Sequence, residues 1–149
     1  MTARKDFTTS ILVDKTPSEV FEAITNVRGW WSQGVQGNTE KLNDEFTYEY
    51  PGLHRSTQKL IEVIPDRKVV WLVTESSMSF IEEKDEWTGT KVIFDITRES
   101  GKTKLTFTHQ GLVPEVECYE ACKPAWTHYV RHSLFSLITT GNGDPNRAG

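Results

Sequence analysis

The segment of residues 125–140 constrains the fold more than any other part of the chain. Its sequence, AWTHYVRHSLFSLITT, places apolar side chains three and four positions apart, the spacing of one face of an amphipathic helix. Pro124 suits the first turn of a helix, and Gly141 suits a left-handed cap after the last turn. We therefore expect a long C-terminal helix that starts at this proline, and the rest of the chain must cover its apolar face.

The upstream chain consists mainly of runs with the alternation and the β-branched residues that are typical of strands. The clearest signal is a hairpin, in which two alternating runs flank the turn sequence ESGK. We expect strands over residues 6–14, 46–50, 54–64 and 69–76, with the hairpin over 90–111. These runs predict an antiparallel sheet of about six strands.

Two short helices are expected directly after the first strand. Thr16, Pro17 and Glu19 form a capping box that starts the first of them. The second contains Trp30 and Trp31. Strand, two helices, a run of strands and a long helix together predict an α+β fold. Since no linker or repeat divides the sequence, we expect one domain over residues 1–149.

Composition and charge argue against several classes of protein. The net charge is −4 and Lys and Arg are scattered among acids, which disfavours a nucleic-acid partner. No apolar run approaches the ~20 residues that cross a bilayer, and the N-terminus lacks the apolar core of a secretory signal, so we expect a cytoplasmic protein. Cys118 and Cys122 have no further ligands at zinc spacing, and no glycine motif for a nucleotide is present. We expect neither a metal nor a cofactor.

The order of elements resembles the START-like, or SRPBCC, superfamily. Within it, the chain is similar to bacterial proteins related to activators of the heat-shock protein 90 ATPase. Four segments carry the likeness, at residues 16–31, 60–73, 103–112 and 118–145. The resemblance implies a helix-grip fold, in which a curved antiparallel sheet wraps around the C-terminal helix and leaves a cavity for a hydrophobic or amphipathic small molecule. The expected partners are such a molecule and, as an option, a second copy of the chain.

Aromatic residues make up 11% of the chain and allow two interpretations. Each buries about 150–250 Å², so they can fill a core, or they can line a ligand pocket with a few polar tips. In the second interpretation Trp126 and Phe107 form a shared wall, while Trp30 and Trp31 form the rim. The candidate ligand-binding residues are Trp30, Trp31, Tyr48, Tyr50, Trp71, Phe94, Phe107, His109, Trp126 and Tyr129.

Among the histidines, His109 is the one whose strand alternation points it inward. A buried imidazole needs a hydrogen-bond partner, and it can orient a ligand, act as a general base or serve a structural role. His128 and His132 have metal-ligand spacing on the last helix, but no acidic third ligand stands on that helix, so a solvated edge is expected. No nucleophile motif is present.

Three functions remain open at this point. The leading hypothesis is a module that binds a small molecule in the cavity. The second is a cyclase, dehydratase or hydrolase that uses the same cavity with His109 as its acid–base group. The third is a protein that interacts with a chaperone or another partner through its surface.

Overall fold

A computed structural model describes residues 6–79, 82 and 86–145. The chain begins with a strand and two short helices, continues through a series of strands and ends in a long helix. In order, the elements are β1 (Phe7–Val13), α1 (Pro17–Thr25), α2 (Val27–Trp30), β2 (Gln36–Gly37), β3 (Glu45–Tyr50), β4 (His54–Ile64), β5 (Lys68–Met78), β6 (Lys91–Glu99), β7 (Lys102–Gln110), α3 (Tyr119–His128), the π-helical segment η1 (Tyr129–Leu134) and α4 (Phe135–Thr140).

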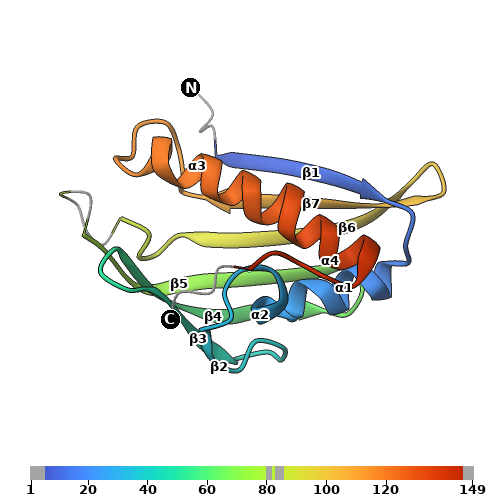
Figure 1. Ribbon diagram of the computed structural model, residues 1–149, viewed down its shortest axis with the longest axis horizontal. Helices are drawn as coiled ribbons and strands as arrows, with labels where there is room; N and C mark the ends of the chain where they lie inside the picture. Colours follow the sequence, from blue (N-terminus) through green and yellow to red (C-terminus); the bar gives the residue numbers. More distant parts are fainter. Residues whose placement is uncertain (1–5, 80–81, 83–85, 146–149) are drawn as a thin grey trace.

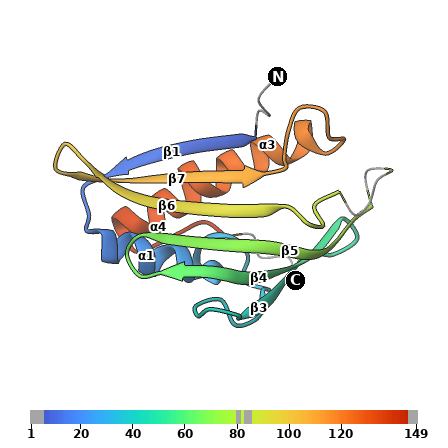
Figure 2. The same ribbon diagram turned by 180° about the vertical axis from the view of Figure 1, so that it is seen from behind.

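The strands form one antiparallel sheet in the order β1-β7-β6-β5-β4-β3-β2. The continuous helix α3-η1-α4 crosses one face of the sheet, and α1 and α2 cover one end of the same face (Figure 1). From behind, the strands lie in front of all the helices (Figure 2). This arrangement confirms the predicted α+β helix-grip fold. None of the helices in the described ranges is both long and apolar enough to cross a membrane.

The sheet has seven strands where about six were expected. The additional strand is β2, in which Gln36 and Gly37 pair with Thr47 and Phe46 of β3. Its two residues lie in a polar, turn-rich stretch, and a two-residue strand is too short to show alternation.

The local signals at the first helix act as predicted. The backbone N–H of Glu19 donates to Thr16 Oγ1 at 3.1 Å, and the backbone N–H of Thr16 donates to Glu19 Oε1 at 3.1 Å. These hydrogen bonds to Thr16 lower the pKa of the Glu19 carboxyl group. The reciprocal bonds satisfy two backbone donors that the first turn leaves unpaired.

The start of the C-terminal helix was predicted wrongly. The helix begins at Tyr119, and Pro124 lies inside its second turn. A proline at this position removes the bond that its N–H would donate to the carbonyl of Glu120, but Glu120 is exposed, so water can take that carbonyl. At the other end Gly141 has a φ of 87° and donates its N–H to Leu137, as expected for a left-handed cap.

The core fills the layer between the sheet and the helices at the end covered by α1 and α2. Trp30 is fully buried there and stacks on Trp71 with ring centroids 6.2 Å apart. The hydroxyl of Ser133 donates to the backbone carbonyl of Trp30 at 2.7 Å, which ties η1 to α2. Phe94 packs against both tryptophans from β6. At this end the space under the long helix is occupied by side chains.

Candidate functional site

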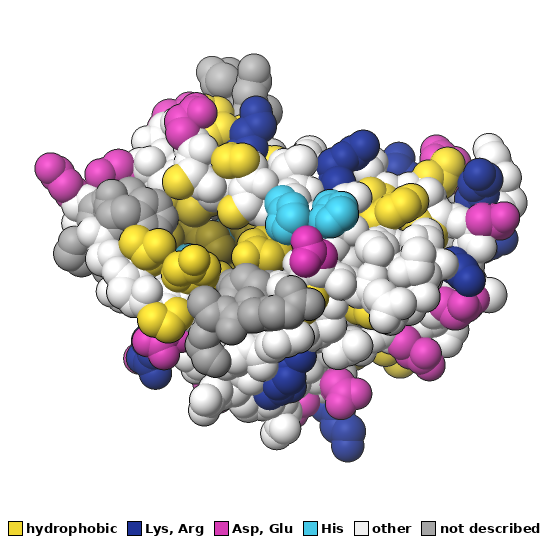
Figure 3. Space-filling model, viewed as in Figure 1, with side chains coloured by type: hydrophobic (Ala, Val, Ile, Leu, Met, Phe, Trp, Pro, Cys, Tyr) yellow, Lys and Arg dark blue, Asp and Glu magenta, His cyan; other side chains and the backbone are white. Residues whose placement is uncertain are grey.

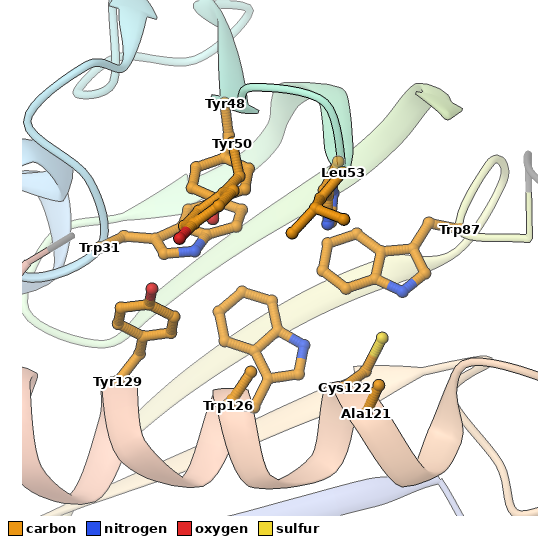
Figure 4. A pocket seen from close by; sticks show the side chains of 11 residues that line it. Trp31, Tyr48, Tyr50, Leu53, Trp87, Ala121, Cys122, Trp126 and Tyr129 are labelled. Atoms are coloured by element: carbon orange, nitrogen blue, oxygen red, sulfur yellow. The ribbon is translucent and has the colours of Figure 1, made fainter. Parts of the chain in front are cut away.

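Under α3, at the opposite end of the layer, the protein contains a cavity of about 240 Å³. Figure 3 shows it from outside as a hollow with hydrophobic walls. The cavity is lined by side chains from the residue after α2, from β3 and the start of β4, from the β5–β6 connection, and from α3 and η1 (Figure 4). These residues are Trp31, Tyr48, Tyr50, Leu53, His54, Trp87, Ala121, Cys122, Ala125, Trp126 and Tyr129.

Two stacked pairs of aromatic rings form the larger part of the walls. Trp31 stacks on Tyr48 with ring centroids 4.3 Å apart and planes 9° apart. Trp87 stacks on Trp126 at 5.6 Å and 11°. The two pairs meet where the rings of Trp31 and Trp126 approach to 5.0 Å. The cavity is therefore bordered by flat aromatic rings from separate parts of the chain.

Glu86 positions both Trp87 and the beginning of α3. Cys118, at the start of that helix, provides no side-chain cap. Instead, the Glu86 carboxylate accepts the backbone N–H groups of Glu117 at 2.5 Å and Cys118 at 2.9 Å. A carboxylate at this place satisfies unpaired donors and interacts favourably with the helix dipole. The indole N–H of Trp87 then donates to Cys118 Sγ at 3.3 Å, so the connection and the helix hold one wall together.

His109 is held behind this wall as a neutral imidazole. The indole N–H of Trp126 donates to its Nδ1 at 3.0 Å, which places the ring proton on Nε2. Nε2 donates to Thr90 Oγ1 at 2.8 Å, and that hydroxyl donates to the carbonyl of Trp87 at 2.6 Å. Burial, with a smaller contribution from His54, lowers the pKa of His109 to about 3. Both ring nitrogens are thus occupied, and neither is available to a ligand as a base.

Two titratable groups of the wall, His54 and Cys122, are uncharged at neutral pH. Burial lowers the pKa of His54 to about 4, and its Nε2 lies 3.0 Å from the hydroxyl of Ser56. A hydrogen bond to Cys118, together with burial, raises the pKa of the Cys122 thiol. A thiol in this state is a poor nucleophile. None of the eleven described lining residues is a lysine, an arginine or a carboxylic acid.

Comparison with known families places this chain. Residues 14–138 match the family described as "Activator of Hsp90 ATPase homolog 1-like protein". The chain belongs to this family. The match covers strands β2 to β7, both short helices and most of the C-terminal helix, so it confirms the resemblance to the Aha-type branch of the START-like superfamily. A comparison with curated proteins found no match.

Solved structures show the same fold at low sequence identity. The Aha1 dimer from Colwellia psychrerythraea superposes with a TM-score of 0.74 at 20% identity, over 93% of this chain and 99% of that one. A protein from Mesorhizobium loti gives 0.70 at 13% identity, over 90% and 96%. A protein from Staphylococcus saprophyticus gives 0.69 at 16% identity, over 97% and 98%. These likenesses show that solved proteins from several bacteria share this fold.

The structure divides the candidate ligand-binding residues into two groups. Five of them border the cavity of this Aha-type domain, namely Trp31, Tyr48, Tyr50, Trp126 and Tyr129. The other five are buried and do not border it, namely Trp30, Trp71, Phe94, Phe107 and His109. Trp30 was expected at the rim but is fully buried in the core, because α2 turns its side chain toward the sheet. Ligand binding stays a prediction for the first group.

Six residues that line the cavity were not among the candidates. Leu53 and His54 lie at the turn between β3 and β4, and Trp87 lies in the polar β5–β6 connection. The remaining three, Ala121, Cys122 and Ala125, lie on α3. Small residues four positions apart are a recognisable signal for an open helix face. Starting the helix at Pro124 hid that signal, since it left Ala121 outside the helix.

The histidine pair on the last helix does have an acidic neighbour in space. The Oδ2 atom of Asp144 lies 3.7 Å from His128 Nε2 and 3.4 Å from His132 Nε2. This carboxylate comes from the segment after α4, so the helix sequence alone could not reveal it. Within the part of the chain that the structure describes, however, no group of three histidine, cysteine or acidic residues has the arrangement of a metal site. The contact is an exposed one between the last helix and the segment that follows α4.

Proposed function

We propose that this protein binds an apolar or amphipathic small molecule in the cavity between the sheet and α3. The observation that carries the proposal is a hollow with aromatic walls at one end of a layer that buried side chains fill at the other end. Small-molecule sites are typically concave and mostly apolar, with a few polar groups. Tyr50 and Leu53 border this cavity and are 39% and 48% exposed, which gives the hollow an apolar entrance.

The size of the cavity limits the ligand. Its volume of about 240 Å³ lies just below the ~300–1,000 Å³ that is usual for sites of drug-sized ligands. A compact molecule would therefore fill it, and a longer amphipathic molecule would leave one end in solvent. Coverage of 93% against a solved Aha-type protein supports one further proposal, that residues 1–149 form a single domain.

The chemistry of the wall favours binding over catalysis. His109, the strongest acid–base candidate of the sequence, uses one nitrogen to accept from Trp126 and the other to donate to Thr90. Cys122 faces the cavity, but the raised pKa of its thiol removes the thiolate that a nucleophile requires. The cavity thus offers surfaces for a ligand and no activated group for a reaction.

The proposal can be tested by closing the cavity. Ala125 is a small, exposed residue at its edge, and a phenylalanine there would occupy the hollow. Ala125→Phe should weaken binding of the neutral fluorophore N-phenyl-1-naphthylamine at least about tenfold, because most of its buried apolar contact is lost. The measurement is saturable fluorescence emission as a function of protein concentration, with melting temperature as the check on folding.

Lys123→Phe is the matched control. Lys123 is exposed on the same helix and does not border the cavity, so the added ring should leave the dissociation constant within about twofold. Absence of saturable emission in the unaltered protein contradicts the proposal. An unchanged affinity in Ala125→Phe also contradicts it, since the fluorophore would then be bound elsewhere.

A further inference from the structure

The indole groups of the aromatic cluster differ in whether their N–H has a partner. Trp30, Trp87 and Trp126 each donate to a protein acceptor, which is a backbone carbonyl, a cysteine sulfur and an imidazole nitrogen in turn. Buried N–H groups are normally satisfied in this way, because an unmade hydrogen bond costs free energy. An indole N–H that has no protein partner and can be reached from a cavity is free to donate to a bound molecule.

Trp31 borders the cavity and has such an N–H. Only 2% of this residue is exposed, and its indole N–H donates to no side chain or backbone group among residues 6–79, 82 and 86–145, but its Nε1 atom is not enclosed by protein atoms. In Figure 4 the indole nitrogen of Trp31 lies on the side of the ring that faces Trp126 and Tyr129. The cavity wall therefore presents one indole N–H that a ligand can reach.

The walls around this donor are flat and uncharged. Trp31 and Trp87 each lie in a stacked pair on opposite sides of the hollow, and aromatic rings favour stacked or edge-on neighbours at 4.5–7 Å. The described lining residues include no lysine, arginine or carboxylic acid that would pair with a charged ligand. Burying an unpaired ionic group in such surroundings is strongly unfavourable.

We propose that the ligand is a neutral, planar aromatic molecule of one or two fused rings whose hydrogen-bond acceptor takes the indole N–H of Trp31. This inference rests on the proposed function, since it names the chemistry of the molecule that the same cavity holds. A ring nitrogen or a carbonyl oxygen on the edge of the ring system meets the requirement. The ring faces supply the contact area and the acceptor sets the orientation.

Quinoline and naphthalene separate the donor from the ring contacts, because they have the same shape and only quinoline carries an acceptor. Trp31→Phe removes the N–H and keeps an aromatic face. The substitution should weaken quinoline about two- to tenfold, the usual net contribution of one hydrogen bond. The same substitution should weaken naphthalene less than about half as much as it weakens quinoline, because naphthalene has no acceptor for the N–H. The measurement is titration of both ligands into both proteins. For each ligand, the dissociation constant in Trp31→Phe is divided by that in the unaltered protein, and the two ratios are compared.

A second measurement on the unaltered protein covers the case in which Trp31→Phe does not fold. Quinoline should move the indole N–H resonance of Trp31 downfield in a ¹H–¹⁵N spectrum, and naphthalene should not. The charged analogue 2-naphthoate should bind at least about tenfold more weakly than naphthalene, because its carboxylate has no partner in the wall. If naphthalene and quinoline both bind, equal losses of affinity in Trp31→Phe together with an unmoved Trp31 resonance contradict this inference and leave the proposed function standing. Where neither binds, the proposed function fails with it.

Discussion

The two ends of the layer between the sheet and the long helix are built from the same elements but are packed differently. At one end Trp30, Trp71 and Phe94 fill the space under η1 and α4, and α1 and α2 close it. At the other end the same helix and sheet leave a cavity of about 240 Å³. The difference teaches that the helix-grip fold alone does not make a site. The size of a few side chains on the helix face decides it.

Those side chains can be read along the helix. Toward the filled end its buried face carries Val130 and Leu134, both with no exposed surface. Toward the open end that face continues with Trp126 and Cys122, and the neighbouring exposed row carries the small residues Ala121 and Ala125 at the edge of the cavity. Small side chains cannot reach the sheet across the layer, so the larger aromatic rings stand around a gap and do not close it. The cavity is a consequence of side-chain volume.

Polarity separates the two ends as well. The half-buried His54 and the fully buried His109 both belong to the open end, where their rings pack edge-on against Trp87 at 4.5 Å and 4.7 Å. The other buried polar residues in the described part of the chain are threonines, serines and a glutamine, whose side chains do not titrate. The open end therefore depends on pH in a way that the filled end does not.

The largest expected effect comes from deleting the same atoms at the two ends. Leu134→Ala removes a fully buried side chain at the filled end and should lower the free energy of unfolding by about 2–5 kcal/mol. Leu53→Ala, at the entrance of the cavity with 48% of its surface exposed, should cost less than about 1 kcal/mol. Urea unfolding of both variants measures the contrast. Equal losses would show that the two ends are packed alike.

The next effect concerns pH at the open end. The folded protein holds the pKa of His109 at about 3 and that of His54 at about 4, against an ordinary value near 6.5. Between these limits the unfolded chain binds protons that the folded protein does not bind. Stability is therefore highest above pH 6.5 and is lost as the pH falls, by about 2 kcal/mol for each histidine between pH 7 and pH 5.

His109→Gln removes the contribution of one of the two histidines to this pH-dependent loss of stability. A glutamine can still accept from Trp126 and donate to Thr90, so stability at pH 7 should change little. Because glutamine does not titrate, the decrease between pH 7 and pH 5 should be smaller than in the unaltered protein by about 2 kcal/mol. Urea unfolding at the two pH values measures it. An unchanged decrease would mean that the imidazole takes up a proton without unfolding.

Much of the fold was predictable because its signals are local. The capping box at Thr16 and Glu19, the glycine cap at Gly141 and the alternating hairpin each act within a few residues. Pro124 shows the limit of such signals. A proline favours a helix start but does not require one, and the carboxylate of Glu86, 32 residues before Cys118, fixes the actual beginning of α3. Sequence patterns along one segment do not contain that contact.

The candidate site was harder to predict, since its residues are chosen by packing. Trp30 and Trp31 are neighbours in the sequence, yet the first lies in the core and the second borders the cavity. Inward alternation placed His109 correctly on the buried face. It could not show that Trp126 lies between this imidazole and the hollow. That placement depends on where the C-terminal helix crosses the sheet, which the strand sequence does not contain.

The smallest expected effect tests whether the two ends are independent. Thr16→Ala removes the capping box of α1, which covers the filled end, and should lower stability by about 1 kcal/mol. Ser18→Ala, at an exposed position of the same helix, is the matched control and should stay within about 0.5 kcal/mol. Since the cavity shares no residue with α1, naphthalene affinity should remain within twofold in both variants. A larger change in Thr16→Ala would show that the filled end sets the shape of the open one, and the comparison between them would then describe one coupled unit.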